Sequence, residues 1–226
     1  MLFHRVLDEV LATWSHIAVL RVLQDPSQGL TGRELARQAG LSHRTCHKAL
    51  TRLENLYILQ RQRGGRSHFF TLNRSHHLVA KVLLPLLVAE RQFGSDFRAT
   101  LQKRLGKAAR SIILFGSVAR KQETPVSDVD LCFIVQQARD KTSVQALVHE
   151  ISPMLFQRFG AKLAPIFFTA VEFKRKAQKQ EPPVNSILDH KNMVAYSGQI
   201  FTRHDVDKLA KLLERFRAWA LSILDS

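Results

Sequence analysis

The sequence predicts a two-domain protein in which a small basic α+β domain precedes an α/β domain with a small mixed sheet. Apolar residues recur at helical spacing through most of residues 4–53, and two short strand-like segments then flank the Gly64–Gly65 pair. After Arg110 the pattern changes to short apolar runs that alternate with longer helical segments, which is typical of an α/β domain. With 226 residues, of which 45% are apolar, the chain can form two small hydrophobic cores.

The chain is strongly basic, with a net charge of +15 and a pI near 10.5. A surplus of this size favours a polyanionic partner, usually a nucleic acid, although a merely solvated basic surface would give the same composition. Residues 30–75 alone contain nine Lys and Arg against two Asp and Glu. The charge is therefore concentrated in one part of the first domain.

Hydropathy and cysteine content indicate the compartment. No apolar run approaches the roughly 20 residues that a membrane span needs, and the opening residues are charged where a signal peptide would be apolar. Cys46 and Cys132 each lie in an apolar-periodic stretch, which predicts buried thiols rather than a disulfide or a zinc site. We therefore expect a cytoplasmic protein with no membrane partner.

Two helices are expected before residue 41. The first spans residues 4–23 and presents one apolar stripe. Its members are Val6, Leu7, Val10, Leu11, Trp14, Ile17 and Leu20. A capping box of Thr31 and Glu34 then opens a second, shorter helix that ends at Gly40.

A third helix is expected after Ser42, its N-cap, and it has two distinct faces. The residues at the spacing i, i+3, i+4, i+7, which should face the core, are Cys46, Ala49, Leu50 and Leu53. The opposite, polar face carries His43, Arg44, His47, Lys48, Thr51 and Arg52. Residues 57–63 and 67–72 are then predicted as the strands of a hairpin that turns at Gly64–Gly65.

Two short helices joined by a tight turn at residues 39–42 and followed by a hairpin are the elements of a winged helix-turn-helix. Residues 4–75 resemble this domain of bacterial transcription regulators, and we assign residues 1–75 to it. The resemblance implies that the polar face of the third helix enters the major groove of double-stranded DNA. It also implies DNA contacts from three wing arginines, namely Arg61, Arg63 and Arg66. A three-helix protein-binding module with a hairpin is the alternative.

Residues 76–108 are expected to link the two domains. A helix over residues 76–105, with a kink at Pro85, suits either a contact between two copies in a homodimer or a purely intramolecular linker. The doublet His76–His77 has no cysteine or carboxylate near it at ligand spacing and is expected at the surface or the start of the helix. Residues 201–226 are expected to form a C-terminal helix that packs on the core or on a second copy.

A Gly-Ser turn and a pair of aspartates adjoin two short apolar runs in the second domain. Residues 111–115 form the first run and end in Gly116 and Ser117, whereas Asp128-Val129-Asp130 opens the second. Side chains two positions apart lie on the same face of a strand, so the two carboxylates share one face. Backbone N–H groups of the adjoining turn can meet phosphate oxygens.

This order, with ten residues between the Gly-Ser and the Asp-x-Asp, resembles the nucleotidyltransferases of the DNA polymerase beta superfamily, above all the minimal nucleotidyltransferases of bacteria and archaea. The resemblance covers residues 109–198, and the domain is assigned to residues 109–200. It implies that Asp128 and Asp130 are catalytic and bind Mg²⁺, which would bridge the phosphates of an NTP. The nucleotide-binding residues that it implies are Gly116, Ser117, Arg120 and Lys121.

The second domain departs from that family in one respect. Active members usually carry a third carboxylate in the next core strand, whereas residues 162–169 contain no acid. Glu172 lies just beyond, at a position that in the family is commonly acidic without being catalytic. The missing acid disfavours rapid turnover, because general-base assistance contributes roughly 10² to 10⁴ in rate.

The preferred interpretation is a DNA-binding transcriptional regulator whose second domain binds Mg²⁺ and an NTP. The alternative is an active nucleotidyltransferase that moves NMP from NTP to a protein or RNA hydroxyl, in a toxin–antitoxin or defence setting. A third interpretation is a repressor with a vestigial nucleotidyltransferase fold that binds no nucleotide.

Overall fold

The computed structural model describes residues 4–25, 29–189, 194–196 and 199–200. The chain divides into two compact units, Met1–Phe93 and Gly94–Ser226. The helix expected over residues 201–226 lies outside the described residues. None of the described helices combines the length and apolar character that crossing a membrane requires.

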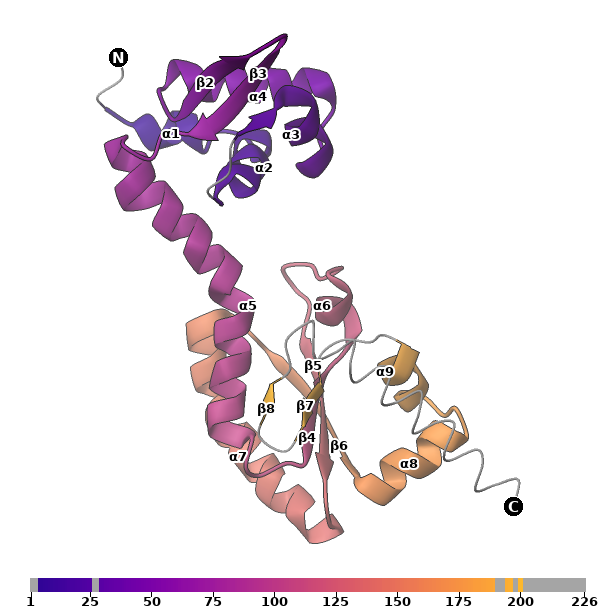
Figure 1. Cartoon of the computed structure of the whole chain (residues 1–226). Helices are drawn as coiled ribbons and strands as arrows, with labels where there is room; N and C mark the ends of the chain where they lie inside the picture. Colours follow the sequence, from indigo (N-terminus) through magenta and orange to yellow (C-terminus); the bar gives the residue numbers. More distant parts are fainter. Residues whose placement is uncertain (1–3, 26–28, 190–193, 197–198, 201–226) are drawn as a thin grey trace. The chain divides into compact units, whose positions relative to one another are not determined.

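The first unit contains a helix-turn-helix and a three-stranded antiparallel sheet (Figure 1). Its elements are α1 (Val6–Val10), α2 (Trp14–Leu23), β1 (Leu30–Thr31), α3 (Gly32–Gln38), α4 (His43–Asn55), β2 (Leu59–Gly64), β3 (Ser67–Leu72), the π-helical segment η1 (Val79–Leu83) and the first part of α5 (Leu84–Leu105). The strand order is β1-β3-β2, so the predicted hairpin β2–β3 forms the wing. The two-residue strand β1, which the sequence pattern did not predict, pairs with β3.

Side-chain caps determine where the two motif helices begin. Thr31 and Glu34 form the predicted capping box of α3, in which each side chain bonds the backbone N–H of the other residue. At the start of α4 the Ser42 hydroxyl accepts the N–H of Thr45 at 3.1 Å. Such a cap contributes about 1 kcal/mol. The residues predicted for the core stripe of α4 are each no more than 2% exposed: Cys46, Ala49, Leu50 and Leu53.

The helix predicted over residues 4–23 is wrong in its continuity, because the chain forms α1 and α2 with a break between them. Thr13 adopts an extended conformation (φ −136°, ψ 148°) directly before α2. The Nδ1 atom of the buried His16 lies 3.1 Å from two carbonyl oxygens at the end of α1 and so gives these backbone groups a partner. The break changes which face is buried, and Trp14 is 66% exposed instead of lying in the core.

The end of α4 adopts a backbone motif that usually contains glycine. The N–H of Tyr57 donates to the carbonyl of Glu54 at 2.8 Å, and the N–H of Ile58 donates to the carbonyl of Leu53 at 3.0 Å. This Schellman arrangement requires a left-handed residue, and Tyr57 accordingly has φ +58°. A side chain in that conformation costs roughly 1–2 kcal/mol, so the helix ends under local strain.

A π-helical turn precedes α5. Pro85, in the first turn of α5, has no N–H with which to continue the series of α-helical hydrogen bonds. The segment η1 ends directly before α5. The irregularity expected at Pro85 therefore begins several residues earlier, as a widened turn.

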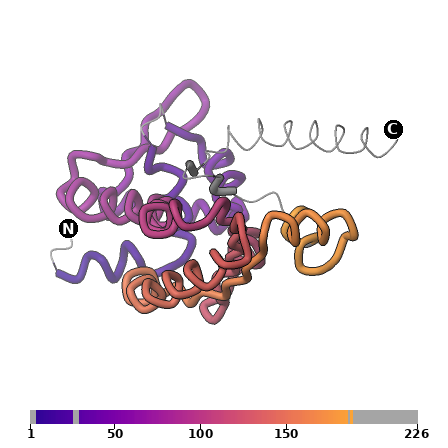
Figure 2. Tube along the Cα trace, turned by 90° about the horizontal axis from the view of Figure 1, so that it is seen from below, coloured from indigo at the N-terminus to yellow at the C-terminus, as the bar shows by residue number. Residues whose placement is uncertain are grey.

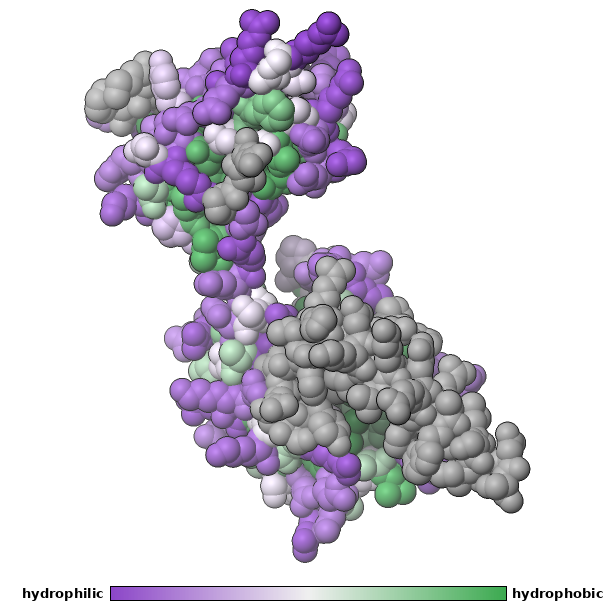
Figure 3. Space-filling view, viewed as in Figure 1, coloured by the Kyte–Doolittle hydropathy of each residue, from purple (hydrophilic) through white to green (hydrophobic). Residues whose placement is uncertain are grey.

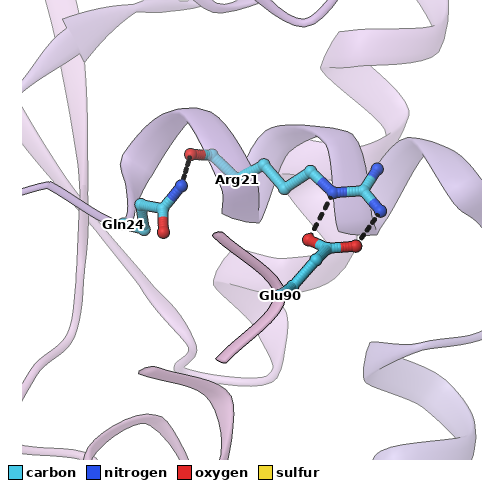
Figure 4. Close-up of polar contacts among 3 residues, drawn as sticks. All are labelled: Arg21, Gln24 and Glu90. Atoms are coloured by element: carbon cyan, nitrogen blue, oxygen red, sulfur yellow. Dashed lines mark hydrogen bonds and ion pairs between the residues drawn. The ribbon is translucent and has the colours of Figure 1, made fainter. Parts of the chain in front are cut away.

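Two ion pairs hold the first part of α5 within the first unit. Arg21 of α2 donates through Nε and Nη2 to both carboxylate oxygens of Glu90, at 2.7 and 2.5 Å (Figure 4). Arg91 lies 2.6 Å from Asp25, just after α2. The Arg21 guanidinium lowers the pKa of Glu90 below its ordinary value. Both pairs are half-exposed or more, so each contributes at most about 1 kcal/mol and mainly orients the helix.

The second unit is built on a mixed sheet with the strand order β6-β5-β4-β7-β8. After the end of α5 its elements are β4 (Ser111–Leu114), α6 (Gly116–Arg120), β5 (Val129–Val135), α7 (Ala138–Phe159), β6 (Leu163–Thr169), α8 (Ala170–Gln178), α9 (Val184–Asp189), β7 (Val194–Tyr196) and β8 (Gln199–Ile200). Strand β5 pairs antiparallel with β4 and parallel with β6. The predicted fold class, a winged helix-turn-helix followed by an α/β domain with a small mixed sheet, is confirmed.

Separate hydrophobic clusters cover the two faces of this sheet. Leu131 and Phe133 of β5 pack with α7 and with the C-terminal part of α5. On the opposite face Cys132 packs with Ile187 of α9. Figure 1 shows the same division, with α5 and α7 on one side of the strands and α8 and α9 on the other, and in the turned view of Figure 2 the segment of α8 and α9 again lies apart from α7. Cys46 and Cys132 are both buried, as predicted, and burial raises the pKa of Cys132 to about 12.

Candidate functional site

The backbone at Gly116 lies directly against the side chain of Asp130. Gly116 begins α6, which follows β4, and Asp130 is the second residue of β5. A Cβ atom placed on Gly116 would lie 1.8 Å from Oδ2 of Asp130, and the backbone there has φ +72°. The N–H of Phe115 donates to the backbone carbonyl of Asp130 at 3.1 Å and holds the two segments together. Both the conformation and the available space therefore require glycine at this position.

Asp130 interacts with Asp128, which lies directly before β5. Asp130 is half-buried, and burial raises the pKa of its carboxyl, with a further increase from the charge of Asp128. Arg120 acts in the opposite direction and lowers that pKa. The Nζ atom of Lys162 lies 3.3 Å from Oδ1 of Asp128. The two carboxylates thus have two positive neighbours, and a divalent cation would compete with Lys162 for Asp128.

The donor chemistry of this carboxylate pair fits a hard divalent cation. Mg²⁺ prefers oxygen ligands and is commonly held by one or two carboxylates together with substrate phosphates. The absence of a side chain on Gly116 leaves room for the Asp130 carboxylate beside the turn. Among the residues that the structure describes, no group of three or more His, Cys, Asp and Glu is placed to hold a metal ion.

The other residues predicted for nucleotide binding belong to the same short segment. Ser117 lies in α6, and its carbonyl accepts the N–H of Gln122 at 2.9 Å. Arg120 and Lys121, at the end of α6, are exposed. The segment that follows Gly116 therefore provides a hydroxyl, a guanidinium and an ammonium group close together in the chain.

The strand beside Asp130 offers no third carboxylate. In the parallel pairing of β5 with β6, Asp130 stands opposite Ala164, and β6 contains no Asp or Glu along its length. Glu172 is engaged elsewhere, because it forms the capping box of α8 with Thr169 and accepts a hydrogen bond from Nζ of Lys141 at 2.5 Å. The Lys141 ammonium lowers the pKa of Glu172. A carboxylate held in this way is a poor proton acceptor.

All nine residues predicted to face DNA are exposed. Those on α4 are His43, Arg44, His47, Lys48, Thr51 and Arg52, and those on the wing are Arg61, Arg63 and Arg66. In the hairpin register Arg61 stands opposite Phe70 and Arg63 opposite His68, so the two arginines share one face of the wing. Figure 3 shows mainly hydrophilic side chains over the part of the first unit where Figure 1 draws the β2–β3 hairpin.

Two of these arginines are paired with acidic residues of the same unit. Arg52 forms an ion pair with Glu9 of α1, and Nε of Arg61 lies 2.9 Å from Oε1 of Glu54 near the end of α4. The predicted DNA-facing cations that have no ion-pair partner among the described residues are Arg44, Lys48, Arg63 and Arg66. The charge that is free to meet phosphate is therefore concentrated in the first half of α4 and near the wing turn.

The sequence interpretation missed Lys162. This residue stands just before β6, and β5 and β6 run parallel, so its ammonium lies beside the start of β5. The order of a strand, a long helix and a strand is typical of a parallel pair. From this pattern the sequence could have placed Lys162 beside Asp128.

Comparisons with known proteins agree with the two-domain fold. Residues 15–56 match the family described as winged helix-turn-helix DNA-binding. Residues 95–191, which include Gly116 and both aspartates, match the family described as nucleotidyltransferase domain. A search of curated proteins finds no match. The chain therefore carries a winged helix-turn-helix domain followed by a nucleotidyltransferase domain, in the order that the sequence predicted.

The close approach at Gly116 gives a prediction with a matched control. Gly116→Ala adds a methyl group where the Asp130 carboxylate lies and should displace it, so a rise in Tm that Mg²⁺ and an NTP give in the wild-type protein should be absent from this variant. Gly160→Ala is the control, because Gly160 has a similar φ of +66° and no atom within 4 Å of the added Cβ. Both variants should lose about 1–2 kcal/mol from left-handed strain. An equal rise in Tm with Mg²⁺ and an NTP in both variants would show that Gly116 takes no part in binding them.

Proposed function

We propose that the protein is a DNA-binding transcriptional regulator whose nucleotidyltransferase domain binds Mg²⁺ and an NTP and transfers the nucleotide slowly or not at all. The pairing of Asp130 with Ala164 carries this proposal, because a carboxylate pair adjoins a glycine turn while the next strand supplies no acid. Nucleotide binding and nucleotide transfer differ in whether they need this missing acid. Metal ligands suffice to hold phosphates, whereas an attacking hydroxyl must also lose its proton.

The nucleotide would bind at the turn between β4 and β5. Asp128 and Asp130 would hold Mg²⁺, which when bound neutralises charge on the triphosphate. The residues that would contact the phosphates are Gly116, Ser117, Arg120 and Lys121. The packing of Gly116 on Asp130 and the effect of Arg120 on the Asp130 pKa support these roles.

The first domain would bind duplex DNA through α4 in the major groove and through the wing. This role is supported by the exposure of the polar face of α4 and by the absence of acidic partners for Arg44 and Lys48 among the described residues. A homodimer would recognise two half-sites of a near-palindromic operator. Binding should be steeply dependent on salt, because each neutralised phosphate releases counterions.

The first prediction of this proposal concerns the recognition helix. Arg44→Ala with Lys48→Ala should weaken binding to an operator duplex by a few kcal/mol, at roughly 1–3 kcal/mol per base contact. The duplex is selected from a random pool with the wild-type protein, and affinities are measured at several salt concentrations. Lys103→Ala with Arg104→Ala removes the same charge from the exposed end of α5 and should change the affinity little. If the first variant keeps its fold and still binds the operator with wild-type affinity, α4 is not the recognition helix.

The second prediction concerns the carboxylate pair. Two adjacent carboxylates repel each other and gain most from a divalent cation between them. Asp128→Ala with Asp130→Ala should therefore abolish the Mg²⁺-dependent rise in Tm with each NTP, while operator binding persists. The control, Asp96→Ala with Glu150→Ala, removes two exposed acidic side chains from α5 and α7. A shift that persists in the aspartate variant would place the nucleotide elsewhere.

The third prediction is that the purified protein transfers nucleotide slowly or not at all. With Ala164 beside Asp130 and Glu172 held by Lys141, no described residue of β6 or the start of α8 is free to take the proton of an acceptor hydroxyl. The protein is incubated with α-labelled ATP, CTP, GTP and UTP and with Mg²⁺ or Mn²⁺, with and without cell extract. Rapid labelling of protein or RNA that disappears in Asp128→Ala would overturn the proposal in favour of an active nucleotidyltransferase. Labelling only with extract would indicate a specific acceptor or a base from a partner.

A further inference from the structure

Tyr57 occupies a backbone position for which glycine is better suited. It follows the C-cap of α4 with φ +58°, whereas Gly40 fills the equivalent position after α3. The Tyr57 carbonyl accepts a hydrogen bond from Nδ2 of Asn73 at 2.9 Å, so the main chain is held in place. The ring, however, is 67% exposed. Burial of the side chain therefore does little to offset the backbone strain, and the surroundings of the exposed ring decide whether it has a functional role.

The position of Tyr57 indicates what that role is. Tyr57 lines a polar groove of about 450 Å³ between the exposed face of α4 and the base of the wing. The other lining residues are His47, Thr51, Glu54, Asn55 and Arg61. Three of these, His47, Thr51 and Arg61, belong to the surface predicted to face DNA. Tyr57 thus borders that surface, although it belongs to neither the recognition helix nor the wing strands.

We propose that Tyr57 contacts the sugar-phosphate backbone of duplex DNA in this groove, with its hydroxyl donating to a phosphate oxygen. This inference rests on the proposed DNA binding of the first domain. A phenol suits the task, because its hydroxyl donates a hydrogen bond while its ring packs against the apolar part of a sugar. The carboxylate of Glu54 in the groove is paired with Arg61 at 2.9 Å, which reduces its repulsion of phosphate.

Tyr57→Gly distinguishes this role from a structural one, because the two roles predict opposite effects. Glycine adopts the left-handed conformation without strain, so the Tm of the transition in which the first domain of the full chain unfolds should rise. The affinity for the selected operator duplex should nevertheless fall by about tenfold or more, as expected for the loss of a hydrogen bond to a charged group. Both quantities are measured on the full-length protein by thermal denaturation and fluorescence anisotropy.

Two further variants complete the test. Tyr57→Phe keeps the ring and the strain, so it should leave Tm unchanged and lose the part of the affinity that the hydroxyl provides. Trp14→Ala removes an aromatic side chain of similar exposure that does not line the groove and should leave the affinity unchanged.

The outcomes separate this inference from the proposed function on which it rests. Higher stability with weaker operator binding in Tyr57→Gly supports the contact. Wild-type affinity in Tyr57→Gly, when Arg44→Ala with Lys48→Ala does weaken binding, overturns the Tyr57 contact alone. A loss of both stability and affinity in Tyr57→Gly also overturns it, since Tyr57 would then support the fold. A wild-type protein that selects and binds no duplex overturns the proposed DNA binding and this inference with it.

Discussion

The alternation of side chains along β5 is the constraint on which the second domain depends. β5 has a neighbour on each side, antiparallel β4 and parallel β6, so its pairing is set along both edges. Leu131 and Phe133 enter the cluster under α5 and α7, and a slip of one residue would turn Asp130 toward that core. The apolar pattern therefore also determines the face of the Asp130 carboxylate. Gly116 then has to be glycine, because that carboxylate occupies the space a side chain would need.

A corresponding constraint acts in α4, where buried side chains recur with the period of a helix instead of alternating as they do along β5. Burial of Cys46, Leu50 and Leu53 leaves the basic residues of the helix on the outside, whatever their role. The ion pair of Arg52 with Glu9 does not conflict with DNA binding. An exposed pair of this kind is worth only about 0–1 kcal/mol, so a phosphate can replace the carboxylate at little cost.

The parts of the fold that were predictable from the sequence depend on short-range patterns. The capping box of Thr31 with Glu34, the cap at Ser42 and the stripe of α4 each need only a few neighbouring residues, and all are present. The apolar runs that became β4 and β5 were predicted for the same reason. The Gly-Ser and Asp-x-Asp motifs could be placed at the ends of these runs, but their mutual approach required a register that no local pattern supplies.

The parts that were missed depend on contacts between distant residues or on competing local conformations. The apolar stripe of residues 4–23 continues through Thr13, but the extended backbone there interrupts the helix and exposes Trp14. The strand β1 has two residues and exists only because β3 pairs with it. The pairing of Lys162 with Asp128 likewise arises from the parallel register of two strands separated by a 22-residue helix.

Left-handed backbone does not by itself mark a functional position in this chain. Gln180 follows the C-cap of α8 with φ +53°, as Tyr57 follows the C-cap of α4 with φ +58°, and both motifs close with the same pair of backbone hydrogen bonds. What distinguishes Tyr57 is its surroundings, since its exposed ring lines a groove shared with Thr51 and Arg61. Gly116 also has a left-handed backbone, but the residue at this position must lack a side chain, because none fits beside Asp130. A left-handed backbone indicates function at these two positions only because an independent feature adjoins it, a groove at Tyr57 and a carboxylate at Gly116.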